Sequence, residues 1–355
     1  MKDALDPCTQ KDASPRRSKI FRVGRVVFIG LLLLCCNGCG SFLARRLVQA
    51  PNSYPDWFAP EAPVTLGFSA GFLTNFPAQF VQAGPPDARI RYRIVPPADY
   101  HMTATSSNWL DHGKPRFNFD FKATLPAPTN AYTASPRGTV ILLHGYALAQ
   151  FSMAPWAIRL ADNGWRCVLV DLRGHGKSTG KKVYYGLEET NDLSRLLDQL
   201  QESNHVSGPV EVMGESYGGA LALRWAGMEP RVDKVIAIAP YVVLSNAIMN
   251  IRREYVGWMP PALLRLGIKK LPQILDCKTE DLDTTTALKR HPVKALFIAG
   301  SADTIMPPSE LKDLESLSLP GSQLVIVDKG THEALTYFFE AMDPPVLKWL
   351  KEGRL

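Results

Sequence analysis

Ser216 stands in the segment of this chain whose residue types best suit nucleophilic chemistry. The sequence Gly-Glu-Ser-Tyr-Gly at 214–218 follows an apolar run at 210–213, typical of a buried strand, and precedes apolar residues at helical spacing over 217–228. A serine on a sharp turn from strand to helix is held out above the sheet, and the positive end of the helix points at the space in front of it. We therefore interpret Ser216 as a nucleophile; the alternative is a small residue at a tight turn.

The turn around Ser216 demands small neighbours. Side chains at Gly214 and Gly218 would collide across such a turn, so we identify these two glycines as the residues that form the elbow. Glu215, between Gly214 and the serine, has two possible roles. It could tune the site, or it could simply bond to a neighbouring loop.

His332 and Asp303 are the residues that could activate this serine. A serine hydroxyl is a poor nucleophile until a neighbouring base takes its proton, and an imidazole can do so near neutral pH. His332 comes after a predicted strand at 324–327, and Asp303 comes after one at 295–299. The carboxylate of Asp303 would hold the imidazole tautomer and stabilise the imidazolium.

Both of these assignments have alternatives. His332 could be a histidine of a surface loop, and Asp303 could be a turn residue or a helix N-cap before the prolines at 307–308. If Asp303 is not the acid, three other carboxylates remain as candidates, namely Asp276, Asp281 and Asp328.

The elements that would bring these residues together begin at Gly138. Strand-like and helix-like patterns alternate from there, with helices expected over 152–163 and 188–202. The strands are expected at 139–143, 166–171, 210–213, 235–239, 295–299 and 324–327. Uninterrupted apolar strands between helices indicate an α/β fold, with a mostly parallel central sheet covered by helices on both faces. Ligands of such sheets bind at the carboxyl ends of the strands.

Three motifs at those strand ends carry a family resemblance. His144-Gly145, the octapeptide Asp-Leu-Arg-Gly-His-Gly-Lys-Ser at 171–178 and the pentapeptide at 214–218 are similar to segments of the α/β-hydrolase superfamily, in particular of its monoacylglycerol lipase and serine aminopeptidase branch. The order Ser, Asp, His along the chain is the order that this fold uses. The resemblance implies an α/β-hydrolase fold with a helical cap insertion, which we place at 241–291.

The resemblance also assigns an oxyanion hole. It implies that the backbone N–H groups of Tyr146 and Tyr217 stabilise the oxyanion that forms on acyl attack. We interpret His144 as a structural hydrogen-bonding residue, with a base as its alternative, and His175 likewise as structural, because its loop must be pinned to the edge of the sheet. We expect the cap at 241–291 to line an acyl or hydrophobic pocket; the alternative is an ordinary helical insertion packed on the core.

These assignments imply a serine hydrolase that cleaves carboxylic esters, either small acyl esters or monoacyl lipids, through an acyl-enzyme on Ser216. The same triad could serve a peptidase, a thioesterase or an acyltransferase. The alternative from another class is a membrane-tethered, non-catalytic binding or scaffold protein on a hydrolase fold. The sequence contains no phosphate-cradling loop, metal-ligand cluster or dinucleotide fingerprint, so we expect no cofactor and no metal, and a small-molecule acyl substrate as the ligand.

Length and charge fit a globular protein with an added leader. The chain has 355 residues and a formal net charge of +6, but residues 1–38 hold seven of its basic residues and three of its acidic ones. The remainder is therefore close to neutral, and its charge gives no reason to expect a nucleic-acid partner. Only two of the six cysteines, Cys167 and Cys277, lie in the body of the chain, so no disulfide framework is expected.

The leader has the composition of a targeting segment. A basic region precedes an apolar run at 26–36, and Gly-Cys-Gly-Ser follows at 38–41, which resembles a bacterial lipoprotein signal with Cys39 as the lipidated residue. A retained anchor over 26–44, which holds no charge, and a plainly cleaved signal are the alternatives. All three predict a protein of the bacterial cell envelope that faces the periplasm or exterior, or, for a cleaved signal, a secreted protein.

We expect three parts in the chain. The leader covers 1–38, a tether and N-terminal arm covers 39–87, and the hydrolase domain covers 88–355 and starts with a strand at 88–95. Within this domain, 117–122 alternates phenylalanine with polar residues and is expected to be a strand, whereas 108–114 is turn-like.

Overall fold

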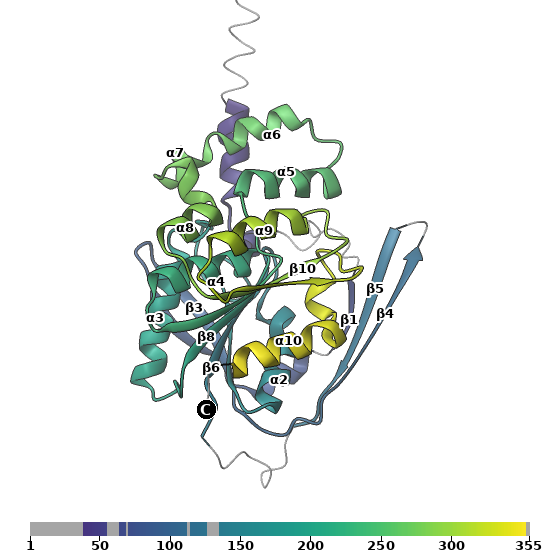
Figure 1. Ribbon diagram of the computed structural model, residues 1–355. Helices are drawn as coiled ribbons and strands as arrows, with labels where there is room; N and C mark the ends of the chain where they lie inside the picture. Colours follow the sequence, from purple (N-terminus) through teal and green to yellow (C-terminus); the bar gives the residue numbers. More distant parts are fainter. Residues whose placement is uncertain (1–37, 55–63, 69, 112–113, 126–134, 353–355) are drawn as a thin grey trace, which may run out of the picture.

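The computed structural model of the chain describes residues 38–54, 64–68, 70–111, 114–125 and 135–352 (Figure 1). The predicted leader lies outside these residues except for its last position, Gly38. No helix within the described ranges combines the length and the apolar character needed to cross a bilayer.

An eight-stranded sheet forms the centre of the molecule (Figure 1). Its order is β11-β10-β9-β8-β6-β7-β3-β2, and the six strands from β6 onward run parallel, which confirms the predicted mostly parallel sheet. β3 runs antiparallel to β7, and β2 runs antiparallel to β3. The strands are β2 (Gln79–Ala83), β3 (Ala88–Val95), β6 (Thr139–Leu143), β7 (Arg166–Asp171), β8 (Val210–Glu215), β9 (Val232–Ile238), β10 (Ala295–Gly300) and β11 (Gln323–Val327).

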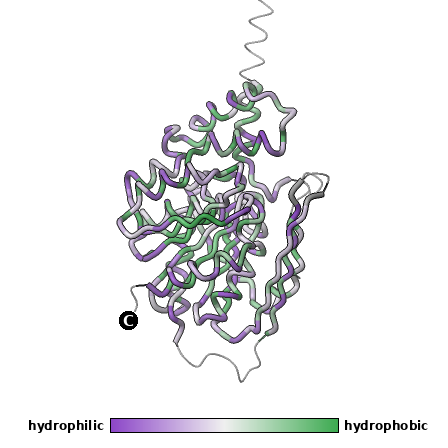
Figure 2. Tube along the Cα trace, turned by 45° about the vertical axis from the view of Figure 1, so that its right-hand side comes forward, coloured by the Kyte–Doolittle hydropathy of each residue, from purple (hydrophilic) through white to green (hydrophobic). Residues whose placement is uncertain are grey.

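Helices cover both faces of this sheet, as predicted. On one face lie α2 (Ala154–Asp162) and α10 (Phe339–Lys351), which Trp156 and Phe339 join by stacking with ring centroids 4.3 Å apart. On the other face lie α3 (Glu189–Glu202), α4 (Tyr217–Met228), α8 (Thr284–Arg290) and α9 (Pro308–Leu317). The sheet is sandwiched, so its strands carry the most hydrophobic residues of the chain, seen in green in Figure 2.

The order of the strands reverses at β6. The chain goes from β6 to β7 on one side and then returns to β8 on the other side of β6, so a crevice opens between the carboxyl ends of β6 and β8. His144 follows β6 and Ser216 follows β8, which places both residues at this crevice.

A second, three-stranded sheet of order β1-β5-β4 lies beside the first (Figure 1). It consists of β1 (Val64–Gly67) and the hairpin of β4 (Thr103–Asp111) and β5 (Lys114–Lys122). The predicted strand at 117–122 is confirmed, because its three phenylalanines are buried and Phe117 stacks on Phe338, 5.0 Å between centroids. The turn predicted at 108–114 is wrong over 108–111, which belongs to β4. Over 103–109 this strand is exposed except for the half-buried Ala104, so no apolar alternation reveals it, and its pairing with β5 decides its conformation.

The N-terminal arm predicted at 39–87 is bound to the body of the molecule. Residues 38–47 form a helix, and the amide of Ala50 donates to the carbonyl of Lys181 at 3.2 Å. Short 3-10 helices follow at η1 (Pro51–Ser53) and η3 (Ala70–Asn75). The predicted domain boundary at 88 is wrong, because β2, which begins at Gln79, is the edge strand of the central sheet. This strand is short and leaves Phe80 exposed, so its sequence resembles a loop.

The helical insertion follows β9, where the sequence predicted the cap. It contains α5 (Leu244–Tyr255), α6 (Pro261–Ile268), α7 (Leu271–Leu275) and η6 (Thr279–Leu282), drawn in green at the top of Figure 1. α8 falls inside the predicted range 241–291 but packs against α4 and α9, so it belongs to the helical layer on the sheet. Residues 38–47 contact α6: a Cβ at Gly40 would lie 3.2 Å from the Leu266 carbonyl.

Candidate active site

Ser216 occupies the sharp turn between β8 and α4. Its φ of 51° and ψ of −112° are rare for a residue with a side chain, and its amide donates to the Ile238 carbonyl at 2.7 Å. A Cβ at Gly214 would lie 2.2 Å from the carbonyl oxygen of Gly218, and one at Gly218 would lie 2.5 Å from the carbonyl oxygen of Leu143. Both positions therefore require glycine: Gly214 because of the turn itself, and Gly218 because the helix starts directly against β6.

Three side chains from distant parts of the sequence meet at this turn. The Oγ of Ser216 lies 2.9 Å from Nε2 of His332, and Nδ1 of His332 lies 2.9 Å from Oδ2 of Asp303. The Asp303 side chain is fully buried, and its Oδ1 accepts the amides of Ile305 and Met306 at 2.9 and 2.7 Å. A carboxylate facing Nδ1 favours the tautomer in which Nδ1 carries the proton, so the lone pair of Nε2 faces the serine hydroxyl.

The three alternative acids are engaged elsewhere. Asp276 ends α7 in a left-handed conformation, Asp281 pairs with Arg290 at 2.7 Å, and Asp328 accepts the hydroxyl of Ser301 at 3.3 Å. Asp303 is also the turn residue that the sequence offered as its alternative role, because it holds the amides that follow it. The two roles coexist, since each oxygen of the carboxylate serves one of them.

His144 and His175 are built into the scaffold beneath the crevice. Nε2 of His144 accepts the Leu172 amide at 3.0 Å, so Nδ1 carries the proton and donates to the Gly145 carbonyl at 2.8 Å. Burial lowers the pKa of His144, and it lowers the pKa of His175 to about 3. Both imidazoles are therefore neutral at physiological pH, and the bonds of His144 to the backbone bear out its structural interpretation.

The amides of Tyr146 and Tyr217 belong to the two segments that flank the crevice. Tyr217 is the first residue of α4, so its N–H is one of those that have no acceptor inside the helix. The rings of Tyr146 and Tyr217 meet edge to face, 5.9 Å between centroids, which brings the two segments side by side. Burial raises the pKa of both phenols, so neither side chain is a proton carrier near neutral pH.

The carboxylate of Glu215 accepts hydrogen bonds from the segments that carry the candidate catalytic groups. One oxygen of its buried carboxylate accepts the Gly145 amide at 3.1 Å and the Ser152 hydroxyl at 2.7 Å. The other accepts the hydroxyl of Thr336 at 2.6 Å, four residues after His332. The sequence left the role of Glu215 open, and only the packing of three separate segments around one side chain could reveal it.

The loop at 171–178 is held by its own first residue. Asp171 accepts the amides of Gln150 and Lys177 at 2.8 and 3.0 Å, and a Cβ at Gly176 would lie 2.5 Å from its carboxyl carbon. Gly176 also has a φ of +52°. The conformation of this loop therefore depends on the small residue and on the carboxylate, and the loop supports the segment that begins η5 (Gln150–Met153).

The cap contacts the loops that carry the acid and the base. From α5, Asn250 donates to the Ile305 carbonyl at 2.9 Å and Arg253 donates to the Thr304 carbonyl at 3.0 Å. Tyr255 of the same helix donates to Glu333, the residue after His332. One side of α5 therefore lies directly on these two loops.

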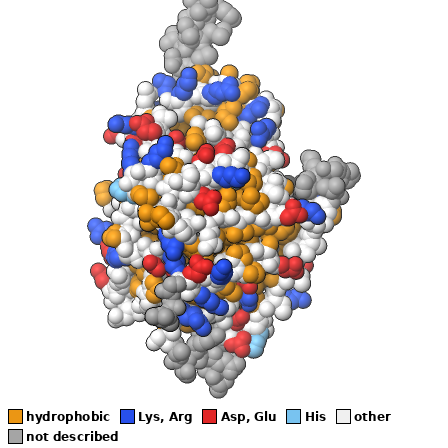
Figure 3. Space-filling view, in the orientation of Figure 1, with side chains coloured by type: hydrophobic (Ala, Val, Ile, Leu, Met, Phe, Trp, Pro, Cys, Tyr) orange, Lys and Arg blue, Asp and Glu red, His pale blue; other side chains and the backbone are white. Residues whose placement is uncertain are grey.

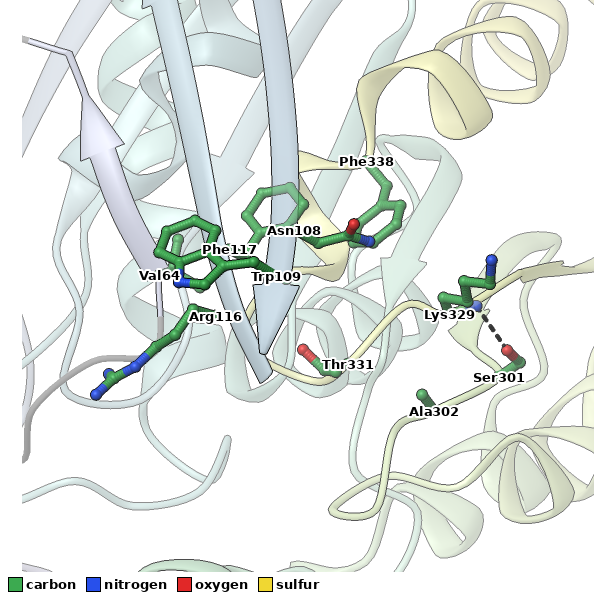
Figure 4. Close-up of a pocket in the computed structure, with 11 residues that line it drawn as sticks. Val64, Asn108, Trp109, Arg116, Phe117, Ser301, Ala302, Lys329, Thr331 and Phe338 are labelled. Atoms are coloured by element: carbon green, nitrogen blue, oxygen red, sulfur yellow. Dashed lines mark hydrogen bonds between the residues drawn. The ribbon is translucent and has the colours of Figure 1, made fainter. Parts of the chain in front are cut away.

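A cavity of about 480 Å³ lies next to the same two loops, on the side of the hairpin (Figure 4). Figure 4 shows Trp109 and Arg116 of the hairpin on one side, Ser301 and Lys329 on the other, and Thr331 between them. It is lined by Val64, Asn108, Trp109, Arg116, Phe117, Ser301, Ala302, Lys329, Thr331, Ala334 and Phe338. No lining residue of this cavity comes from the cap, and the hairpin supplies one of its walls.

The described part of the chain shows neither a pair of bonded cysteines nor a cluster of metal-binding side chains. Cys39 is exposed on the helix at 38–47, Cys277 is partly buried, and burial raises the pKa of Cys167. Within the described ranges, no group of three or more His, Cys, Asp and Glu side chains could hold a metal ion.

Comparisons with known proteins show which sequences this chain resembles. The family model described as serine aminopeptidase, S33, matches residues 134–292. The chain is 34% identical over 96 residues to a monoacylglycerol lipase of Mycolicibacterium smegmatis, a match that covers 27% of this chain and 34% of the lipase. It is 34% identical over 138 residues to a pimeloyl-[acyl-carrier protein] methyl ester esterase of Chromobacterium violaceum, covering 39% of this chain and 47% of the esterase. The chain thus spans less than half the length of these two relatives.

The fold has a counterpart among solved structures. An esterase of Pyrococcus furiosus superposes with a TM-score of 0.56 at 18% identity, covering 82% of this chain and 98% of the esterase. At that identity, the likeness shows a shared fold.

Proposed function

We propose that this chain, which has the α/β-hydrolase fold and is similar to the serine aminopeptidase and monoacylglycerol lipase branch of that superfamily, is a serine hydrolase that cleaves carboxylic esters through an acyl-enzyme on Ser216. The observation that carries the proposal is the unbroken set of hydrogen bonds from Ser216 through His332 to Asp303 at a strained elbow. A strained backbone is retained where the surrounding structure enforces it, which is common at catalytic centres.

In the proposed reaction, Oγ of Ser216 attacks the ester carbonyl carbon while Nε2 of His332 takes the hydroxyl proton. Asp303 stabilises the imidazolium, and the amides of Tyr146 and Tyr217 hold the oxyanion. The tetrahedral intermediate then collapses, the C–O bond to the leaving group breaks, and His332 returns its proton to the departing alcohol. Water, deprotonated by His332, attacks the acyl-enzyme. The bond from the acyl carbon to Oγ then breaks, His332 returns its proton to Oγ, and the carboxylic acid and free Ser216 are released.

The names of the relatives and the cavity beside the triad support small acyl esters or monoacyl lipids as substrates. One relative is a monoacylglycerol lipase and another is a methyl ester esterase. The cavity offers the side chains of Trp109, Phe117 and Phe338 next to Thr331, the neighbour of His332, so we assign it to an apolar part of the substrate.

Peptide hydrolysis is the second candidate, and the description of the matching family model as a serine aminopeptidase favours it. The triad treats amides and esters through the same kind of intermediate, so the leaving group is the difference between the two candidates. Parallel assays with p-nitrophenyl esters of graded acyl length and with aminoacyl anilides separate them. Faster turnover of the anilides would replace the esterase assignment.

Labelling by a fluorophosphonate probe tests the nucleophile. We expect the full chain to be labelled, Ser216→Ala to be unlabelled, and kcat of this variant for the best ester to fall about a thousandfold or more. Ser194→Ala is the matched control, because Ser194 bonds to Glu229 and Trp225 away from the crevice. Labelling that survives in Ser216→Ala, or an unlabelled parent, would favour a non-catalytic binding protein.

From the leader sequence, we also propose that the enzyme is held at the membrane of a bacterial cell envelope, with Cys39 as the lipidated residue. Metabolic labelling with a fatty-acid analogue, followed by fractionation, tests this. We expect incorporation into the parent and none into Cys39→Ser. A labelled Cys39→Ser protein would refute lipidation at this residue, and an unlabelled parent in the membrane fraction would favour the anchor.

A further inference from the structure

Exposed apolar side chains are concentrated at one end of the molecule, on what we call the cap face. The cap face comprises the helix at 38–47, α5, the loop at 256–260, and α6 with the two lysines that follow it. Its exposed large apolar side chains are Phe42, Ile251, Tyr255, Trp258 and Leu266. Trp258 is 80% exposed and Phe42 59%, the two highest values among the large hydrophobic residues described. The exposure of these two large apolar side chains does not stabilise the fold, which suggests a surface used for binding.

The charge of the cap face has one dominant sign. It carries seven basic residues, Arg45, Arg46, Arg252, Arg253, Arg265, Lys269 and Lys270, and one acidic residue, Glu254. Among the described residues, none of these seven forms an ion pair with a carboxylate. Two of them bond to backbone carbonyls, Arg252 within the cap and Arg253 on the adjoining loop of Thr304. In Figure 3, blue and orange side chains lie together over this end of the molecule. The rest of the body beyond the leader holds 26 basic and 30 acidic residues and is slightly negative, so the positive charge is concentrated on the cap face.

The parts of the cap face are packed into one surface. A Cβ at Gly267 would lie 2.8 Å from Cβ of Leu43, so the helix at 38–47 and α6 are in close contact. The guanidinium of Arg46 lies 5.5 Å from the centre of the Phe42 ring. Arg252 donates to the carbonyls of Gly257 and Met259, which folds the loop of Trp258 back onto α5.

Two observations identify a phospholipid surface as the partner. A mixture of Trp, Phe and Leu with Lys and Arg is the composition of surfaces that lie in the interface of an anionic bilayer. In addition, the helix at 38–47, which is part of this face, carries the exposed Cys39, so the lipidation proposed above would attach the protein to the membrane at this end. An acidic protein would match the charge, but it would not account for the proposed membrane attachment on the same face.

We infer that the cap face docks on anionic phospholipid, with Trp258 and Phe42 in the interfacial layer and the basic side chains against lipid phosphates. The inference concerns the body of the protein and goes beyond a tether, because a tethered body could rotate freely. One side of α5 lies on the loops of Asp303 and His332, so docking would hold the triad next to the bilayer. If the proposed esterase function is correct, its substrate class is amphiphilic esters taken from the membrane.

Quenching of tryptophan fluorescence by brominated lipids tests the docking of the full chain. Ser216→Ala protein is reconstituted into vesicles of phosphatidylcholine with roughly 30% phosphatidylglycerol, with bromine on the acyl chains. We expect quenching in the parent, loss of most of it in Trp258→Phe, and no loss in Trp109→Phe. Trp109 is the matched control, because it is also exposed, at 48%, but lies on the hairpin. Trp156, Trp165, Trp225 and Trp349 are buried and should contribute little.

The same assay tests whether docking depends on the basic side chains of the cap face and on anionic lipid. Arg265→Gln with Lys269→Gln, omission of phosphatidylglycerol, or about 0.5 M salt should each remove most of the Trp258 quenching, because interfacial charge pairs are screened by salt. Quenching that is unchanged in Trp258→Phe, or that is lost in Trp109→Phe instead, would overturn the proposal. An absence of quenching in every vesicle would overturn it in favour of a protein partner. The Ser216→Ala background makes each of these results independent of whether the protein is a hydrolase.

Discussion

At the scale of single residues, Glu215 joins the nucleophile to the segments on either side of it. Its carboxylate holds the Gly145 amide, one residue before the amide of Tyr146, and the hydroxyl of Thr336, close to His332. The side chain is buried, so loss of these acceptors would leave three donors without partners in a region of low dielectric. Glu215 is therefore a positioning residue for the proposed chemistry.

Substitutions of Glu215 can show whether it positions the catalytic groups, which would change kcat, or only stabilises the fold, which would change Tm. We expect Glu215→Ala to lower kcat for a small ester about 100-fold with little change in KM, because the amide of Tyr146 and the base lose their fixed geometry. Glu215→Gln keeps one acceptor oxygen and should recover part of the loss. Calorimetry supplies Tm for each variant. A variant with lowered Tm but the kcat of the parent would show that Glu215 only supports the fold.

At the scale of elements, the β4–β5 hairpin supplies one wall of the cavity beside the triad. Trp109 and Phe117 of the hairpin line this cavity together with Ser301 and Thr331. Ser301 lies two residues before Asp303, and Thr331 directly precedes His332. β5 is fixed on the core by aromatic contacts with Phe338 and Tyr337. The hairpin is thus a rigid wall, and its aromatic residues are in a position to select the apolar part of a substrate.

Truncation of Trp109 tests this wall. We expect Trp109→Ala to lower kcat/KM about tenfold for a long-chain ester and less than twofold for an acetyl ester, because only the longer chain reaches the cavity and loses apolar contact there. Trp258→Ala removes another exposed tryptophan, outside the cavity, and should leave both values unchanged for soluble esters. Equal losses for the short and the long ester in Trp109→Ala would remove the cavity from the substrate site.

At the scale of the whole molecule, two buried neutral histidines make the free energy of unfolding depend on pH. Burial lowers the pKa of His144 and brings that of His175 to about 3. An unfolded chain has histidines of ordinary pKa, about 6.5, and takes up protons below that pH while the folded chain does not. The free energy of unfolding therefore falls as the pH drops from about 6.5 toward 3, by about 3 kcal/mol for His175 at pH 4.5.

Urea unfolding at pH 7 and pH 4.5 measures this contribution. We expect the loss of stability between the two pH values to be smaller by about 3 kcal/mol in His175→Phe, which keeps an aromatic ring beside Tyr217. His101→Phe is the control for the replacement of a histidine by phenylalanine at an exposed position. An identical pH dependence in His175→Phe and the parent would show that His175 is protonated in the folded chain.

The sequence by itself determined the parallel sheet, the elbow and the order of the candidate triad along the chain. Those features depend on local patterns: continuous apolar strands, glycine where a side chain has no room, and helical spacing. It missed β2 and most of β4, because an edge strand and a polar hairpin strand have no face that is uniformly buried, and their pairing partners decide their conformation.

Only the tertiary structure decided which acid faces His332, what Glu215 holds, and which element walls the cavity. Asp303, Asp276, Asp281 and Asp328 are equivalent as residue types, and the choice among them is a matter of position in space. The same is true of the cap face, whose basic and apolar residues come from segments some 200 positions apart in the sequence. Contacts between residues that are so far apart in the sequence depend on the packing of the whole chain, and local sequence patterns do not predict them.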